Sequence, residues 1–124
     1  MAEVPDLPLR DLADLDALLG RAARETFVVF KHSTACPISA HAYGELVRFL
    51  RERANGEPRV ALVRVIEERA VSKAIEQRLG VKHESPQAIV VRGGSAVASL
   101  SHGAITAEAL REAVSPNLSS GTGK

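Results

Sequence analysis

The chain has 124 residues, of which 45% are hydrophobic and 25% are charged, and its formal net charge is +1. This length suits a single globular domain, and the composition argues against global disorder. The near-balanced charge disfavours a nucleic-acid surface, and the longest apolar runs are too short to cross a membrane. The first residues lack the basic and apolar segments of a secretory signal peptide.

Cys36 is the only cysteine in the chain. A single thiol excludes an internal disulfide framework and a Cys-x-x-Cys zinc site, and the four histidines are not spaced as metal ligands. A free thiol stays reduced in the cytoplasm, which is therefore the expected location. We expect no nucleic-acid or membrane partner, no metal, and a monomer that could form a Cys36–Cys36 linked dimer in air.

Hydrophobic periodicity and turn residues predict the secondary structure. Asp11 and Thr106 are expected helix caps, Pro37 suits a first helical turn, and Gly80 is expected to end a helix. The pair Gly93-Gly94 is typical of a hairpin turn. In chain order, the predicted elements are a helix at 11–24, a strand at 27–30, a helix at 37–53, a strand at 60–66, a helix at 69–79, strands at 88–91 and 96–100, and a helix at 106–114.

The element order is therefore α-β-α-β-α-β-β-α. The first β-α-β unit should form a right-handed parallel crossover, and the last two strands should pair antiparallel. This order predicts an α/β fold with a mixed four-stranded sheet and helices on both faces, which is the thioredoxin-like arrangement. We expect one domain over residues 1–115 and a disordered, Gly/Ser-rich tail over residues 116–124.

The segment from Lys31 to Ser39 leads from the first predicted strand into the second helix. Ligand sites in open α/β sheets lie outside the carboxyl ends of parallel strands. Cys36 falls at the start of that helix, where unpaired backbone N–H groups and the helix dipole favour a thiolate. Lys31 and His32 could add positive potential. A small buried hydrophobic role, common for free cysteine, is the alternative, but this position favours a reactive thiol.

Cys36-Pro37-Ile38-Ser39 forms a Cys-x-x-Ser motif. Ser39 occupies the place of the second cysteine in a Cys-x-x-Cys redox pair, and its oxygen cannot form a disulfide. The chain can therefore attack a disulfide and form one mixed disulfide, which an external thiol must release. Ser39 could donate a hydrogen bond to the Cys36 thiolate or cap the helix, and Thr34 is a further candidate for tuning the thiol.

Ser85-Pro86 precedes the predicted strand at 88–91. In the thioredoxin-like order this place holds a cis-proline that faces the redox cysteine. Such a proline presents the backbone of the preceding residue to an extended, thiol-bearing ligand. We therefore expect a cis bond before Pro86, although trans is the commoner state of X–Pro bonds, and we expect Ser85 and Pro86 to line a ligand groove.

The segment around the cysteine closely resembles the YtxJ family, the monothiol bacilliredoxins. This segment is Phe30-Lys31-His32-Ser33-Thr34-Ala35-Cys36-Pro37-Ile38-Ser39. The Ser85-Pro86 pair and the stretch from Ser101 to Thr106 also resemble that family. The similarity extends over residues 8–115.

The resemblance implies a cytoplasmic thiol–disulfide oxidoreductase that removes bacillithiol from mixed disulfides on client proteins. It implies that Cys36 attacks, that bacillithiol is a co-substrate, and that no cofactor is tightly bound. The partners would be bacillithiol and bacillithiolated proteins. Because bacillithiol carries malate carboxylates, cationic groups on the rim would help to bind it, and the candidates are Lys31, Lys82 and Arg92.

Three other functions stay open at this point. The chain could be a glutathione-dependent monothiol redoxin, an iron–sulfur-binding protein of the monothiol glutaredoxin kind, or a non-catalytic thioredoxin-like interaction module. Pro37-Ile38 replaces the Gly-Phe of the cluster-binding motif, and this bulkier pair disfavours close approach of a cluster. A peroxidase is also disfavoured, because Thr34 lies two residues before Cys36 instead of three.

Overall fold

A computed structural model of the chain describes residues 7–33, 35–53 and 58–115. The elements of this part are β1 (Leu7–Pro8), α1 (Leu12–Arg21), β2 (Phe27–His32), α2 (Pro37–Glu52), β3 (Arg59–Arg64), α3 (Arg69–Leu79), β4 (Gln87–Arg92), β5 (Ser95–Ser101), the 3-10 helix η1 (His102–Ala104) and α4 (Ala107–Val114).

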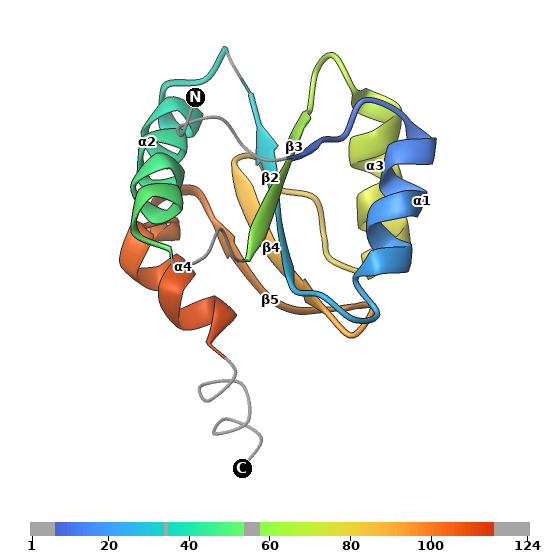
Figure 1. Cartoon of the computed structure of the whole chain (residues 1–124). Helices are drawn as coiled ribbons and strands as arrows, with labels where there is room; N and C mark the ends of the chain where they lie inside the picture. Colours follow the sequence, from blue (N-terminus) through green and yellow to red (C-terminus); the bar gives the residue numbers. More distant parts are fainter. Residues whose placement is uncertain (1–6, 34, 54–57, 116–124) are drawn as a thin grey trace.

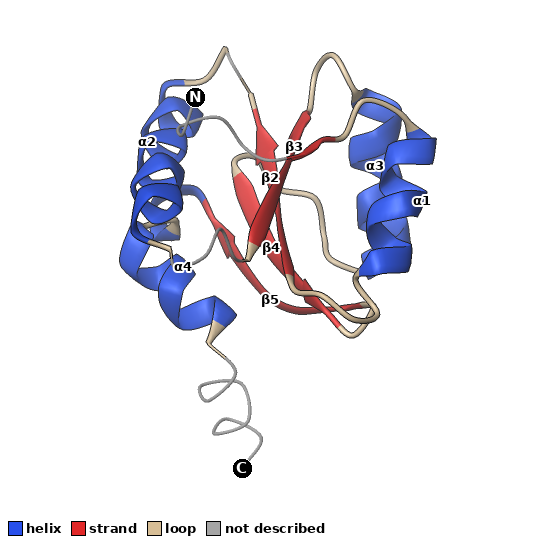
Figure 2. Cartoon of the chain, viewed as in Figure 1, coloured by secondary structure: helices blue, strands red, loops and turns tan. Residues whose placement is uncertain are grey.

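The strands form one mixed five-stranded sheet in the order β1-β3-β2-β4-β5 (Figure 2). Strands β1, β3 and β2 run parallel, whereas β2 with β4 and β4 with β5 pair antiparallel. The predicted count of four strands is wrong by one, because Leu7 and Pro8 pair with Ala61 and Leu62 at the edge. A two-residue strand that contains proline has too little alternation to be recognised in a sequence.

The sheet lies between two helical layers, with α2 and α4 over one face and α1 and α3 over the other (Figure 1). The side chains of β2 are divided between the two resulting cores. Phe27 and Val29 belong to the core under α1 and α3, and Val28 and Phe30 to the core under α2 and α4. Successive strand residues point to opposite faces, so a strand buried on both faces reads as an unbroken apolar run.

Capping and turn residues behave largely as predicted. The Asp11 carboxylate accepts from Asp14 N–H, and the Thr106 hydroxyl accepts from Ala109 N–H. Gly80 ends α3 in the left-handed conformation, with φ of 67°. Gly93 and Gly94 have φ of 63° and 81°, which a two-residue hairpin turn of this kind requires and which glycine adopts without steric cost.

Several predicted boundaries are wrong. The strand predicted at 27–30 continues to His32, and the two last strands each extend one residue further at both ends. The first helix ends at Arg21 and not at residue 24, because the chain turns there, with Arg24 and Glu25 donating N–H bonds to Arg21 C=O. The strand predicted at 60–66 ends at Arg64, so Ile66 lies in the following turn and is 60% exposed. No helix in the described ranges is long and apolar enough to span a membrane. The predicted tail at 116–124 lies outside the described residues.

Candidate functional site

Cys36 lies where the chain leaves the carboxyl end of β2 and enters α2. It is the N-cap residue of α2, with an extended backbone, and its side chain makes no capping hydrogen bond. Its N–H donates to Ser33 C=O at 3.3 Å, and its C=O accepts from Ala40 N–H at 3.0 Å. The residue is partly exposed. Cys36 therefore sits at the positive end of the dipole of a 16-residue helix, within reach of solvent.

The Ser39 hydroxyl connects the first turn of α2 to the end of β2. Its oxygen accepts from Ser33 N–H at 2.9 Å and lies 2.8 Å from His32 Nδ1. Ser39 is fully buried. Within the described residues this oxygen makes no hydrogen bond to the Cys36 thiol and caps no α2 N–H group. Ser39 thus has other partners than the two expected from the sequence, and it fixes the path of the loop that carries Cys36.

His32 is held between β2 and α2 by two aromatic rings. Its ring stacks on Tyr43, with centroids 5.0 Å apart, and lies 5.8 Å from the ring of Phe30. Burial lowers the pKa of His32, although the Glu67 carboxylate opposes this shift. The imidazole is therefore neutral at neutral pH, with one nitrogen as donor and the other as acceptor.

Lys31 and His32 are neighbours in sequence but face opposite sides of the sheet. Lys31 is fully buried on the side covered by α3, and its Nζ lies 3.0 Å from His83 Nδ1. Burial lowers the pKa of Lys31, and the Glu76 carboxylate opposes this shift. The expectation that Lys31 is a rim cation is therefore wrong, because strand alternation turns its side chain inward. His83 is a neighbour of this site that the sequence did not single out, since nothing local to it indicates a partner 52 residues away.

The peptide bond between Ser85 and Pro86 is cis, as predicted. Gln87 pairs with Lys31 in the antiparallel register, so Pro86 lies beside the end of β2 that leads to Cys36. Pro86 C=O accepts from His102 N–H at 3.0 Å, which brings η1 to the same region. The Ser85 hydroxyl is buried and has no hydrogen-bond partner within the described part of the chain.

Of the other expected site residues, Arg92 lies away from the thiol. Arg92 is not a rim cation near Cys36, because it lies at the opposite end of β4 and bonds Thr26 Oγ1 at 3.2 Å and Val114 C=O at 2.6 Å. Lys82 is exposed in the segment before Pro86, where its C=O accepts from Gln87 Nε2 at 3.0 Å. Pro37 is exposed in the first turn of α2. Thr34 lies outside the described residues.

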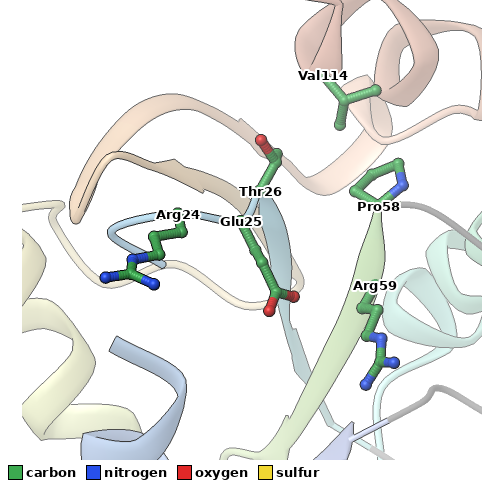
Figure 3. A pocket seen from close by; sticks show the side chains of 6 residues that line it. All are labelled: Arg24, Glu25, Thr26, Pro58, Arg59 and Val114. Atoms are coloured by element: carbon green, nitrogen blue, oxygen red, sulfur yellow. The ribbon is translucent and has the colours of Figure 1, made fainter. Parts of the chain in front are cut away.

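A cavity of about 400 Å³ lies at the edge of the sheet where β2 and β3 begin, away from Cys36. Figure 3 shows Glu25 between Arg24 and Arg59 in its wall. Cys36 comes after the other end of β2, so this cavity is separate from the thiol. The site that combines thiol, helix N-terminus and cis-proline is the one at the carboxyl end of β2.

Residues 7–110 match the profile of the monothiol bacilliredoxin BrxC family. The matched segment includes β2, Cys36, α2 and the cis-proline. The chain belongs to this family. A monothiol bacilliredoxin with a single cysteine cannot complete a dithiol cycle within one chain, in agreement with the Cys-x-x-Ser motif.

Solved structures share the fold of this bacilliredoxin. One, described as a candidate oxidoreductase with a thioredoxin fold, is 33% identical, with a TM-score of 0.78 over 88% of this chain and 93% of the other. Mitochondrial thioredoxin 3 from Saccharomyces cerevisiae has 16% identity and a TM-score of 0.70 over 92% and 97%. Fasciola hepatica thioredoxin has 18% identity and a TM-score of 0.70 over 88% and 96%.

The two thioredoxins share the fold with this bacilliredoxin, and the predicted thioredoxin-like class is confirmed. Family and fold together make the chain a thiol–disulfide oxidoreductase. The non-catalytic interaction module considered from the sequence is therefore not retained.

Proposed function

We propose that this bacilliredoxin removes bacillithiol from mixed disulfides on protein cysteines, with Cys36 as the attacking thiolate. The observation that carries the proposal is the position of the only cysteine. Cys36 is the N-cap residue of α2, is partly exposed and forms no disulfide. In general, unpaired N–H groups and the dipole at a helix N-terminus favour the thiolate of a cysteine, and only the thiolate is a competent nucleophile.

The first step exchanges one disulfide for another. The Cys36 thiolate attacks the bacillithiol sulfur of the client–bacillithiol disulfide, and the client sulfur leaves as a thiolate that takes up a proton. A disulfide between Cys36 and bacillithiol forms while the client disulfide breaks, so no net oxidation occurs. Because Ser39 replaces a resolving cysteine, the mixed disulfide on Cys36 persists until a second thiol arrives.

The second step regenerates the enzyme. A bacillithiol thiolate attacks the bacillithiol sulfur on Cys36, which releases the Cys36 thiolate and forms oxidised bacillithiol. Overall, the mixed disulfide on the client and one free bacillithiol are converted into the client thiol and oxidised bacillithiol. This cycle requires a compartment that keeps thiols reduced, and we propose the cytoplasm.

The surrounding residues position the reacting groups. Ser39, through His32 and Ser33, holds the Cys36 loop against β2. We propose that Ser85 and Pro86 line a ligand groove beside that loop, and Pro37 directly follows Cys36 in the first turn of α2. Thr34, outside the described residues, stays a predicted thiol-tuning residue. Ile38, which is 53% exposed next to the thiol, offers an apolar contact for a client protein.

The proposal is tested by intact mass spectrometry of the reduced protein after brief exposure to oxidised bacillithiol or, separately, oxidised glutathione. We expect one adduct at Cys36, formed faster with bacillithiol, and no adduct in Cys36→Ser. A client protein carrying bacillithiol should then lose it on incubation with catalytic amounts of the enzyme and free bacillithiol.

Three results would speak against the proposal. Equal rates with both disulfides would indicate a general monothiol redoxin. Adducts or client reduction in Cys36→Ser would remove Cys36 from the mechanism. Visible absorbance after anaerobic purification would favour the iron–sulfur alternative.

A further inference from the structure

A groove of about 420 Å³ runs along the junction between the end of β3 and the first turns of α3. We call it the β3–α3 groove. Val65 and Ile66 form its apolar part, and Arg69 and Lys73 bring two cationic side chains to it from α3. Its remaining wall is polar and comes from Ser72, Glu76 and His83.

The groove adjoins the loop that carries Cys36. Val65 N–H donates to His32 C=O at 2.9 Å, which joins one wall of the groove to the last residue of β2. On the other wall, His83 Nδ1 lies 3.0 Å from Nζ of Lys31, which comes directly before His32 in β2. Cys36 follows His32 by four residues, and His83 precedes the cis-proline by three. The groove, the thiol and the proline therefore share one edge of the sheet.

The two cations of the groove differ from the five arginines that the structure pairs with carboxylates. Arg21, Arg48, Arg64, Arg78 and Arg111 each form an ion pair with a carboxylate. Across the described ranges, Arg69 and Lys73 have no carboxylate within ion-pair distance. Their charges are thus not neutralised by the protein itself.

The acidic groups beside the groove have partners of their own. Glu76 accepts from His83 N–H at 3.1 Å and interacts with the buried Lys31 ammonium. Glu68 is bound to Arg64 at 2.6 Å, and Glu67 is not among the residues that line the groove. The groove consequently presents unpaired positive charge to an incoming anion.

We propose that the β3–α3 groove binds the carboxylate-bearing end of the small thiol that exchanges with Cys36, with Arg69 and Lys73 as its anion-binding residues. This inference rests on the proposed function and names the part of the site that recognises the co-substrate. A guanidinium can hold a carboxylate by two parallel hydrogen bonds, and an ammonium adds a mobile point charge. Arg69 and Lys73 thus take the carboxylate-binding role that the sequence suggested for Lys31 and Arg92, because the fold places those two side chains elsewhere.

The test compares two double variants with the same change in net charge. Arg69→Gln/Lys73→Gln neutralises the groove, and Arg24→Gln/Arg59→Gln neutralises two cations of the cavity at the opposite edge. Adduct formation at Cys36 is timed by mass spectrometry with three disulfides, namely oxidised bacillithiol, oxidised glutathione and uncharged bis(2-hydroxyethyl) disulfide. The two carboxylate-bearing probes distinguish the thiols that could supply the anion.

We expect the groove variant to react about fivefold more slowly with oxidised bacillithiol, since removing rim charges acts mainly on association. Its rate with the uncharged disulfide should equal that of the wild type, and the control variant should match the wild type with every probe. A groove variant as fast as the wild type with oxidised bacillithiol, or an equally slow control, would overturn the inference alone. A wild-type protein that forms no adduct with oxidised bacillithiol would overturn the proposed function as well.

Discussion

The imidazole Nδ1 of His32 lies 2.8 Å from the hydroxyl oxygen of Ser39, seven residues further along the chain. His32 is the last residue of β2, and Ser39 is in the first turn of α2. The same oxygen accepts from Ser33 N–H, so one buried hydroxyl closes the loop that contains Cys36. Ser39, which stands where a dithiol protein has its second cysteine, thus fixes the loop that carries Cys36.

We expect Ser39→Ala to destabilise the protein by about 1–3 kcal/mol, because it leaves the Ser33 N–H and a buried imidazole nitrogen without their partner. The measurement is urea unfolding, with Ser99→Ala on the exposed side of β5 as the control. Adduct formation at Cys36 should also slow, since the loop is less well positioned. Equal midpoints for Ser39→Ala and the wild type would contradict the role assigned to this hydroxyl.

Replacing the same residue by cysteine should change the redox cycle. Residue 39 lies one turn into α2 from Cys36, so Ser39→Cys creates a Cys-x-x-Cys pair. On mild oxidation we expect the loss of two hydrogen atoms by mass spectrometry and an intramolecular disulfide in place of a lasting bacillithiol adduct. Cys36→Ser/Ser39→Cys should form no such disulfide. A stable bacillithiol adduct on Ser39→Cys would indicate that the two sulfurs cannot meet.

The stability of the protein should fall as the pH is lowered through the range in which His32 titrates. Burial holds the pKa of His32 below its ordinary value of 6.5. Between the two values the unfolded chain binds the proton and the folded chain does not. The free energy of unfolding therefore decreases on acidification from pH 6.5, by at most about 1.4 kcal/mol per pH unit for this proton.

Variants isolate the contribution of His32 to this pH dependence. His32→Gln keeps a hydrogen-bonding group near Ser39 and removes the titration, so its unfolding free energy should depend less steeply on pH than that of the wild type. Ser99→Ala, which changes no titratable group at an exposed position of β5, should retain the wild-type slope. Identical slopes for His32→Gln and the wild type would show that His32 does not contribute.

Arg92 should matter for stability and not for thiol exchange. Its guanidinium joins β4 to Thr26 and to the end of α4, at the edge of the sheet opposite Cys36. We expect Arg92→Met to lower the free energy of unfolding by about 1–3 kcal/mol, because hydrogen bonds to a charged group are lost. Its rate of adduct formation with oxidised bacillithiol should match the wild type. Slower adduct formation in Arg92→Met would indicate that Arg92 contributes to binding the thiol after all.

Much of the fold could be predicted from local signals. The wholly apolar run at Phe27–Phe30 indicated a central strand, Asp11 and Thr106 capped helices as expected, and Gly93-Gly94 made the hairpin turn. Strand β1 was not predicted, because two residues are too few to show an alternation of apolar and polar side chains. The end of α1 at Arg21 was not predicted, because tertiary packing and not a helix-breaking residue sets the turn into β2.

Local features of the sequence are enough to identify the atom that can react. One cysteine, a proline after it and a serine three residues on define a monothiol site at a helix start, and Ser85-Pro86 marks the strand that lies beside it. These features are local, since a helix N-terminus and its dipole depend only on neighbouring residues.

The surroundings of that atom depend on how distant segments of the chain pack together. Strand alternation sends Lys31 and His32 to opposite faces, but which helix covers each face is settled by packing between distant segments. That packing pairs Lys31 with His83 and buries His32 against Tyr43. It also places Arg92 at the end of the sheet remote from Cys36, and Arg69 and Lys73 at the end near Cys36. Contacts across such separations leave no periodic trace in the sequence, because each partner looks locally like an ordinary polar residue.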